Sequence, residues 1–266
     1  MGFLTDLVAT IRRDLAERPL DVARLRDEAD VRPAAERFAE VLRRSPGPAL
    51  IAEMKRASPS AGTIDDRADP RTLAGLYVDG GAAAISVLTE PRHFHGSLED
   101  LTEVRTTVDV PVLRKDFLID PAQILEARAA GADSVLLIAS CLGDTDLIDL
   151  LAVARSLGME PLLETHSDRD LERALATDAA VIGVNARDLE TLAVDVPAAM
   201  ERIGRIGGDR VAVLESGIRS PEDVRAAVDA GAAAVLVGET LMRAGDPRAT
   251  IRRLLGHDAL RSKESA

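Results

Sequence analysis

The sequence is poor in cysteine, in aromatic residues and in basic charge. A single cysteine, Cys141, among 266 residues excludes an internal disulfide and any cysteine-based metal cluster. Trp is absent and aromatic residues make up only 2% of the chain, so stacking on nucleic-acid bases is not expected. A formal net charge of −12 also argues against the basic stripe that nucleic-acid binding requires. We therefore expect no nucleic-acid partner.

Long hydrophobic runs are missing as well. No apolar stretch approaches the ~20 residues that cross a bilayer. The N-terminal segment, MGFLTDLVATIRRDLAERP, mixes charged and apolar residues at helical spacing and lacks a signal-peptide core. It predicts an amphipathic helix over residues 2–17. We expect a cytoplasmic protein without membrane contact, and both a monomer and a weak homodimer remain open.

Lysine is the third scarce residue, with three lysines against 30 arginines. The Arg and Asp bias fits either salt adaptation or a biased genome, and composition does not separate the two. Lys263 lies in a polar C-terminal tail, residues 257–266, which leaves Lys55 and Lys115 within the folded region. A chain that otherwise uses Arg has kept lysine at these two positions, which makes both candidates for chemistry.

Short apolar segments alternate with longer amphipathic ones after Pro48, which predicts βα units and a parallel sheet. The expected strands are residues 49–54, 83–88, 111–116, 134–139, 159–164, 180–185, 211–216 and 233–238. Helix starts are marked by Asp69–Pro70 and Ser220–Pro221. The predicted helix ends are Gly80, Gly131, Gly158 and Gly231.

Eight strands followed by a last helix at residues 246–256 predict an α/β fold, a (β/α)8 TIM barrel that forms one domain over residues 1–256. Helices at 2–17 and 33–44 precede the first strand as an N-terminal extension. A doubly wound sheet is the alternative. It is disfavoured because no G-x-G-x-x-G sequence follows the first strand.

Polar residues gather at the predicted strand ends, where the active site of such a barrel lies. They are Glu53, Lys55, Lys115, Glu164, Asn185, Glu215 and Ser216. Buried charges are costly unless paired, so a structural ion-pair network is one explanation. Lysine in place of arginine favours proton transfer, because crowding or burial can bring the pKa of a lysine toward neutrality while arginine keeps its proton.

Two glycines suggest a phosphate site. Gly217 and Gly238 follow the last two predicted strands, and in barrels these two loops often hold phosphate through backbone N–H groups. Ser58 and Ser60 either cap the loop after the first strand or contact a ligand. We expect no metal site, because the histidines, His93, His95, His166 and His257, show no shared ligand geometry. For Cys141 we expect packing rather than nucleophilic catalysis.

Five segments together resemble the indole-3-glycerol phosphate synthase family. They are IAEMKRASPSAG (51–62), AISVLTE (84–90), PVLRKDFLID (111–120), IGVNARDL (182–189) and ESGI (215–218). The resemblance runs from about residue 3 to 256. The E-M-K-R-A-S-P-S segment is specific, whereas V-G-E and S-G-I occur in many phosphate-binding barrels.

The resemblance implies a cofactor-free ring closure of 1-(2-carboxyphenylamino)-1-deoxyribulose 5-phosphate to indole-3-glycerol phosphate, a step of tryptophan biosynthesis. It implies Lys115 as general acid, Glu164 as acid or base in the dehydration, and Lys55 as a substrate ligand that shares the acid role. Glu53 and Asn185 would position the substrate and the lysines, while Glu215 and Ser216 would complete the polar rim.

The resemblance also implies the binding groups. Phosphate would rest on Ser216, Gly217, Gly238 and the amide of Glu239, whose side chain we expect to point away from the anion. The anthranilate ring would enter an apolar slot. The residues expected there are Phe94, Phe117, Leu136 and Leu189, with Phe3 closing the slot. Arg187 is expected to meet either a substrate carboxylate or a neighbouring Asp.

Three positions depart from the family pattern: His93, Ala122 and Glu239. None of them removes a proton-transfer group. Three other functions remain as alternatives at this point: a sugar-phosphate isomerase, a Schiff-base aldolase that uses Lys115, and a non-catalytic barrel.

Overall fold

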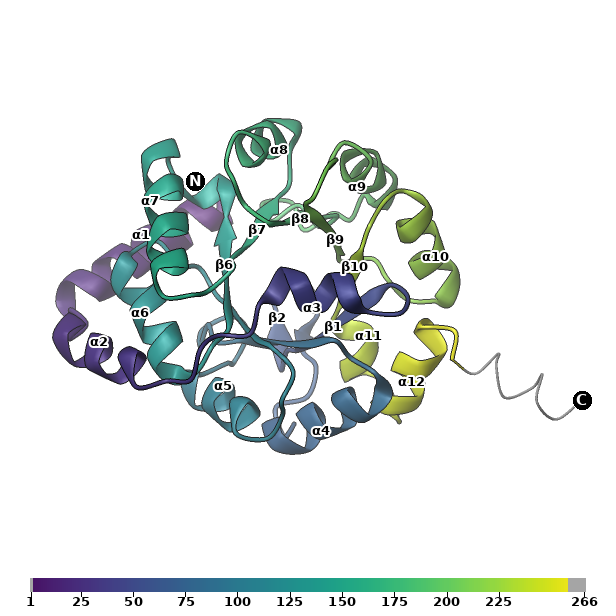
Figure 1. Cartoon of the computed structure of the whole chain (residues 1–266), viewed down its shortest axis with the longest axis horizontal. Coiled ribbons are helices and arrows are strands. Elements are labelled where there is room, and N and C mark those ends of the chain that lie inside the picture. The colour runs from purple at the N-terminus through teal and green to yellow at the C-terminus, as the bar shows by residue number, and fades with distance from the viewer. Residues whose placement is uncertain (1, 258–266) are drawn as a thin grey trace, which may run out of the picture.

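A computed structural model describes residues 2–257 as a closed barrel of parallel strands surrounded by helices (Figure 1). The strands follow one another around the barrel in the order β1-β10-β9-β8-β7-β6-β5-β4. Their bounds are β1 Ala49–Met54, β4 Ala84–Leu88, β5 Val112–Lys115, β6 Ser134–Ile138, β7 Leu162–Thr165, β8 Val181–Asn185, β9 Val211–Glu215 and β10 Ala234–Val237. The predicted (β/α)8 barrel is confirmed.

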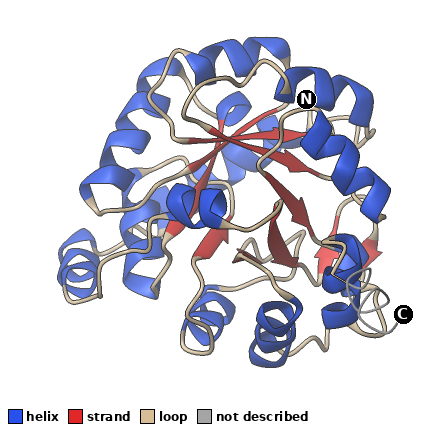
Figure 2. Ribbon diagram, turned by 45° about the vertical axis from the view of Figure 1, so that its right-hand side comes forward, coloured by secondary structure: helices blue, strands red, loops and turns tan. Residues whose placement is uncertain are grey.

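Each barrel strand is followed by a helix that packs on the outside of the barrel (Figure 2). These helices are α4 Pro70–Gly80, α5 Leu98–Arg105, α6 Pro121–Ala130, α7 Asp144–Ser156, α8 Asp168–Leu175, α9 Val196–Ile203, α10 Pro221–Asp229 and α12 Pro247–Leu254. Asp69 and Ser220 cap α4 and α10 from the side chain, each with a proline at the first helical position, as predicted.

Smaller elements lie in the connections at the carboxyl ends of the strands. They are the hairpin of β2 Ala57–Ser58 and β3 Gly62–Thr63, the 3-10 turn η1 Ala139–Cys141 and the short helix α11 Glu239–Met242. The sequence analysis predicted none of them. No helix among the described residues has the length and apolar character needed to cross a membrane.

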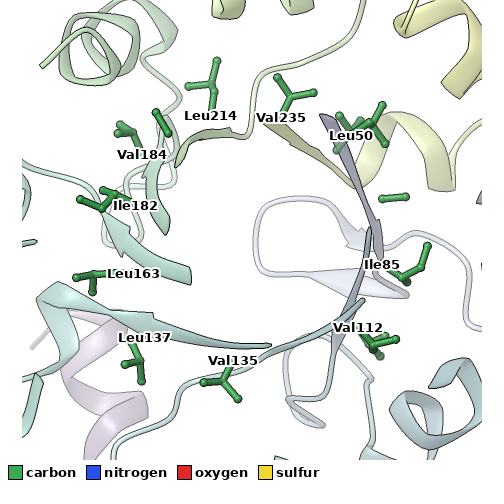
Figure 3. Close-up of a cluster of buried hydrophobic side chains, with 14 of the residues drawn as sticks. Leu50, Ile85, Val112, Val135, Leu137, Leu163, Ile182, Val184, Leu214 and Val235 are labelled. Carbon is green, nitrogen blue, oxygen red and sulfur yellow. The ribbon is translucent and has the colours of Figure 1, made fainter. Parts of the chain in front are cut away.

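Alternation along the strands creates two apolar layers. One layer fills the space between strands and helices, and Figure 3 shows its side chains, among them Leu50, Ile85 and Val235, pointing away from the barrel axis. The other layer fills the barrel itself and includes Ile51 and Leu113. Because side chains alternate between faces, each strand contributes to both layers.

Three helices precede the barrel: α1 Phe3–Glu17, α2 Val22–Asp30 and α3 Phe38–Arg44. Figure 1 shows α3 lying across the barrel opening. This is the amino end of the strands, because the amide of Ala39 donates to Glu160, just before β7. Phe38 and Leu42 are buried in the same cluster as the inward-facing strand residues. The helix therefore closes the end opposite to the expected site.

The predicted helix over residues 33–44 is found only over its second part, and residues 33–37 are not helical. Helix α3 begins only at Phe38, and the prediction missed α2 altogether. The segment between them is held against α6 and the start of β6: Arg128 donates to the carbonyl of Pro33, and the amide of Glu36 donates to Asp133. The Pro33 carbonyl, which a helix starting here would use for its first turn, is thus bound to Arg128, and the segment has no regular secondary structure.

Two smaller predictions also needed correction. The fifth barrel strand begins at Leu162, because Pro161 has no N–H to donate to the ladder. Gly80 is the last residue of α4, and Gly81, with φ +103°, forms the left-handed cap. A Cβ on Gly80 would lie 2.9 Å from Cβ of Ile251, so Gly80 allows α4 to pack closely on α12. The predicted tail lies outside the described residues from position 258 onward.

Candidate active site

The strand alternation carries charged residues into the barrel mouth. Glu53 lies two residues beyond the inward-facing Ile51, and Lys115 lies two residues beyond Leu113. Glu164, Asn185 and Glu215 occupy the corresponding positions of β7, β8 and β9. The same period of two that fills the barrel with apolar side chains thus places a polar layer at its carboxyl end.

These residues line one cavity of about 780 Å³, within the size range of small-molecule sites. Every residue predicted for the site contributes to its wall: Glu53, Lys55, Ser58, Phe94, Lys115, Phe117, Leu136, Glu164, Asn185, Arg187, Leu189, Glu215, Ser216, Gly217, Gly238 and Glu239. Lys55 and Lys115 therefore face the same space. The side chain of Phe3 lies outside the described part of the chain.

Lys115 stands between two buried carboxyl groups. Its Nζ lies 3.0 Å from Oε2 of Glu164 and 3.2 Å from Oε2 of Glu215. Burial alone would lower the pKa of Lys115, but the negative charges of Glu164, Glu215 and Glu53 outweigh it and raise the pKa. The expectation that crowding brings Lys115 toward neutrality was wrong for the free protein, because the crowding groups are carboxylates.

One ammonium cannot neutralise two carboxylates, and the two glutamates respond differently. Burial alone would raise the pKa of Glu164, but Lys115 and His166 lower it to about 2. Burial raises the pKa of Glu215 well above its usual range, and the negative charge of Glu164 adds to this effect. The site therefore combines a Lys115 with a raised pKa, a Glu164 with a lowered pKa and a Glu215 with a raised pKa, so the two carboxyl groups differ in how readily they hold a proton.

Two glycines make room for buried carboxylates. A Cβ on Gly183, in the middle of β8, would lie 2.2 Å from Oε1 of Glu215. A Cβ on Gly238 would lie 2.3 Å from Oε1 of Glu53, which also accepts from Lys55 at 2.8 Å. Gly238 was predicted for phosphate alone, and the structure gives it this second, steric reason.

The loops after β9 and β10 also line the cavity. Ser216 and Gly217 both have positive φ, 67° and 83°, and the Ser216 hydroxyl donates to Oδ1 of Asn185 at 2.8 Å. Glu239 is the first residue of α11, where helix N–H groups lack intrahelical partners. Its carboxylate accepts from Nε of Arg243 at 3.0 Å, so the side chain is bound along its own helix.

An apolar region adjoins Lys115. The rings of Phe94 and Phe117 lie 6.2 Å apart between centroids, and Phe117 and Leu136 are buried. Arg187 lies at the edge of this region, where Nη1 donates to the carbonyl of Leu192. No ion pair joins Arg187 to an acidic residue within 2–257, so the predicted pairing with a neighbouring Asp is not found.

The loop after β1 is held by its own serines. Ser58 is buried, its hydroxyl accepts from the amide of Ala61 at 3.1 Å, and it lies 3.3 Å from the Ser60 hydroxyl. Both serines also line the cavity, so capping and cavity lining are not exclusive. Within the described residues, no cluster of His, Cys, Asp or Glu has the arrangement of a metal site.

Two residues of the site were missed from the sequence. Gly183 is an isolated glycine inside a strand, a pattern that signals close approach of another group. His166 follows Glu164 by two residues, and its Nε2 lies 3.2 Å from Oε1 of Glu164. The same alternation that placed the glutamates could have placed this histidine beside them.

The fold resembles solved barrels of low sequence identity. A 3-hexulose-6-phosphate synthase superposes with a TM-score of 0.63 at 18% identity, covering 78% of this chain and 98% of that one. A tryptophan synthase α subunit from Legionella pneumophila superposes with a TM-score of 0.58 at 15% identity, covering 82% and 95%. At these identities the likeness concerns the fold alone.

Sequence relatives are much nearer. Indole-3-glycerol phosphate synthases from Beutenbergia cavernae and a Nocardioides species are 48% and 49% identical to this chain. The alignments cover 98% and 96% of this chain and 99% of each relative. The family model of indole-3-glycerol phosphate synthase matches residues 4–254, which include every lysine and glutamate of the cavity. Fold, polar layer and relatives agree, and the chain belongs to the indole-3-glycerol phosphate synthase family.

Proposed function

We propose that this chain converts 1-(2-carboxyphenylamino)-1-deoxyribulose 5-phosphate to indole-3-glycerol phosphate, carbon dioxide and water. The observation that carries the proposal is Lys115, held between Glu164 and Glu215 in a cavity with an apolar slot on one side and the glycine-bearing loops on the other. These three regions match the reacting ketone, the aromatic ring and the phosphate of the substrate.

The reaction requires that oxygen atoms of the substrate be protonated twice and that one proton be removed from carbon. The ring carbon that bears the carboxylate attacks the ketone carbon, and the ketone oxygen takes a proton as the carbon–carbon bond forms. Carbon dioxide then leaves, which restores the aromatic ring. The new hydroxyl departs as water with a second proton, while the neighbouring carbon loses a proton to complete the indole. The reaction as a whole neither oxidises nor reduces the substrate, so it requires no redox cofactor.

Lys115 supplies the first proton in this proposal. Its raised pKa keeps the ammonium charged in the free site, and a ketone oxygen inserted beside Nζ would replace one of its carboxyl partners. Losing that partner lowers the pKa of the lysine as negative charge develops on the oxygen. Glu164, ionised between Lys115 and His166, is placed to take the carbon proton or to assist departure of water.

The other polar groups orient these two and the substrate. Lys55, paired with Glu53 at 2.8 Å, reaches the same cavity and is proposed to bind the substrate and share the acid role. Asn185 accepts hydrogen bonds from the Ser216 hydroxyl and the amide of Arg187. It thereby ties the end of β8 to the loop after β9, the two segments that flank the substrate.

Both anionic ends of the substrate have a proposed partner. Phosphate would rest on the backbone of Ser216, Gly217, Gly238 and Glu239, with the Glu239 carboxylate held by Arg243 rather than by the ligand. The guanidinium of Arg187 would meet the carboxylate on the aromatic ring, since no described acidic residue is paired with it. The ring itself would lie among Phe94, Phe117, Leu136 and Leu189.

The direct test is purified protein with the carboxyphenylamino substrate. Indole-3-glycerol phosphate formation gives a rise in indole fluorescence, which we expect without any added metal or cofactor. Absence of the rise in the folded protein contradicts the proposal. An aldolase that uses Lys115 is the chemical alternative, and reduction with borohydride in the presence of substrate would then leave a covalent adduct on that lysine.

The cytoplasmic location and the monomer or weak homodimer stay predictions of the sequence analysis. Light scattering during gel filtration, over a range of protein and salt concentrations, measures the oligomeric state. The same salt series with the fluorescence assay tests whether the excess of acidic residues reflects adaptation to salt.

A further inference from the structure

His166 contacts the carboxylate of Glu164 from the side opposite to Lys115. Nε2 of His166 lies 3.2 Å from Oε1, while Oε2 accepts from Nζ of Lys115 at 3.0 Å. The two oxygens of Glu164 therefore have different neighbours. The imidazole is not among the groups that line the cavity.

The imidazole has no other evident use. Its side chain is only 10% exposed, and neither ring nitrogen completes a well-aligned hydrogen bond within residues 2–257. Buried polar atoms normally have partners, and those that lack one in a folded protein call for an explanation. The carboxylate of Glu164 is an acceptor already within reach, and a small rotation of the imidazole would align the two groups.

Two other acidic groups near His166 have hydrogen-bond partners of their own. Oδ1 of Asp188, in the loop after β8, accepts from the amides of Glu190 and Thr191 and from the Thr191 hydroxyl, and no ion pair joins Asp188 to His166 among the described residues. Asp170, on α8, accepts from the amide and hydroxyl of Ser167.

The remaining neighbours favour the same partner. Burial raises the pKa of Cys141, on η1 against β7, to about 12, so this group stays a neutral thiol. Lys115 and Glu215 line the cavity, where Lys115 pairs with Glu164 and with Glu215. Among the described acidic residues, Glu164 is the one that forms an ion pair with His166.

We propose that His166 is a positioning residue, which donates from Nε2 to Oε1 of Glu164 and thereby keeps Oε2 turned toward Lys115. The proposal rests on the proposed function, in which Glu164 moves a proton. A carboxylate fixed at both oxygens stays in line with its reacting partner, and loss of one contact lets it rotate. The negative charge of Glu164 is also favoured by the nearby imidazole.

Two substitutions separate hydrogen bonding from packing. His166→Phe keeps the volume of the ring but has no donor. His166→Gln carries an amide N–H at a similar reach and does not titrate. We expect His166→Phe to lower kcat roughly 10-fold, since one charge-assisted hydrogen bond is lost, with KM changed less than about twofold. We expect His166→Gln to stay within about threefold of the unchanged protein.

The dependence of kcat on pH distinguishes the proposed contact from a packing role, because a change in packing alone would not shift it. His166 helps to lower the pKa of Glu164, so the acidic limb of the kcat profile should shift to higher pH in His166→Phe. His257→Phe is the matched control, because His257 is exposed beyond the end of α12 and far in the chain from the polar layer. It should leave both kcat and the limb unchanged.

Several outcomes would overturn the proposal. It fails if folded His166→Phe keeps the kcat and the acidic limb of the unchanged protein. It also fails if His166→Gln and His166→Phe lose activity equally, with a lower thermal midpoint and no shift of the limb. An inactive unchanged protein would instead refute the proposed function, so the two failures are distinguishable.

Discussion

Arg114 and Lys115 are neighbours in β5, and their side chains lie on opposite faces of the barrel wall. Arg114 points outward and is almost completely buried. Its guanidinium binds Asp116 at 3.0 Å, Glu126 at 2.9 Å, the carbonyl of Gln123 and the hydroxyl of Thr89. This is a structural ion-pair network, the alternative that the sequence left open for the barrel mouth, and it lies one residue away from the mouth.

The inward face differs in how well its charges are matched. Lys115 meets two carboxyl groups at once, and both oxygens of Glu215 lack a well-aligned hydrogen bond within the described chain. Arg114 has planar donors that fit its acceptors, whereas the single ammonium of Lys115 faces two carboxyl groups whose pKa values are shifted in opposite directions. A satisfied network stabilises the fold, and an unsatisfied one is suited to exchange protons with a ligand.

The largest expected effect breaks the inward network. Lys115→Ala should lower kcat by at least about 10³-fold, because the acid and its positive charge both disappear. Lys115→Arg should restore little, since arginine does not release its proton near neutral pH. Fluorescence kinetics measure the rate, and circular dichroism verifies that both variants are folded. Near-normal activity of Lys115→Arg contradicts the general-acid role.

The second effect breaks the outward network. Arg114→Leu leaves the buried Asp116 and its neighbour Glu126 without their counter-ion, and removal of one partner from a buried pair costs about 3 kcal/mol of unfolding free energy. Urea denaturation measures the loss. The rate per folded molecule should fall far less than in Lys115→Ala. A stability loss below about 1 kcal/mol would show that the outward network is not structural.

Much of this arrangement was readable from the sequence. The alternation of short apolar segments with amphipathic ones and the Gly and Pro positions predicted the barrel, and the polar residues at the predicted strand ends placed Glu53, Lys115, Glu164 and Glu215 around one site. Adjacent residues of a strand point to opposite faces, so the sequence also predicts that Arg114 faces away from Lys115.

What the sequence did not reveal depends on contacts between distant segments. Helix α2 has only Leu25 and Ala29 buried, and it is held by packing of Leu25 against Leu125 and Ala129 of α6. The pKa of Lys115 depends on how many carboxyl groups lie within a few ångströms of it, which strand-end composition does not give. A residue list predicts the members of a charge cluster better than their protonation.

The third expected effect is a change in stability when Glu215, on the inward face, is replaced by an uncharged residue. The folded-state pKa of Glu215 is raised, so stability contributed by its neutral form is present below the unfolded pKa of about 4.3 and is lost as pH rises through the folded value. Glu215→Gln mimics the neutral form and should be more stable than the unchanged protein at pH 8, with the difference disappearing as the pH falls to about 4.

The control for this comparison is Glu164, whose pKa is shifted the other way. Its contribution is present above about pH 4.3 and is lost as pH falls toward the folded value of about 2. Glu164 and Glu215 influence each other's pKa, so urea midpoints of Glu164→Gln over the same pH range are needed to separate the two contributions. A Glu215→Gln variant that is less stable than the unchanged protein at pH 8 would mean that folding lowers the pKa of Glu215 and does not raise it.

The smallest expected effect tests how the inward face is shaped. Gly183→Ala places a methyl group where Oε1 of Glu215 lies, so the carboxyl must move away from its position beside Lys115. We expect kcat to fall about 10-fold, equivalent to about 1.4 kcal/mol, with the fold retained, because the crowded atoms are the ends of the Glu215 and Leu162 side chains and not backbone.

A double-mutant cycle decides whether the effect of Gly183→Ala passes through Glu215. In a Glu215→Ala background the methyl group has space, so adding Gly183→Ala should change kcat no further. Gly75→Ala is the matched control, since a Cβ there meets no atom within 4 Å and should leave activity unchanged. If Gly183→Ala acts equally in both backgrounds, its effect runs through the β8 backbone. The clearance above Gly183 would then be a matter of packing, and the arrangement of charges around Lys115 would not depend on it.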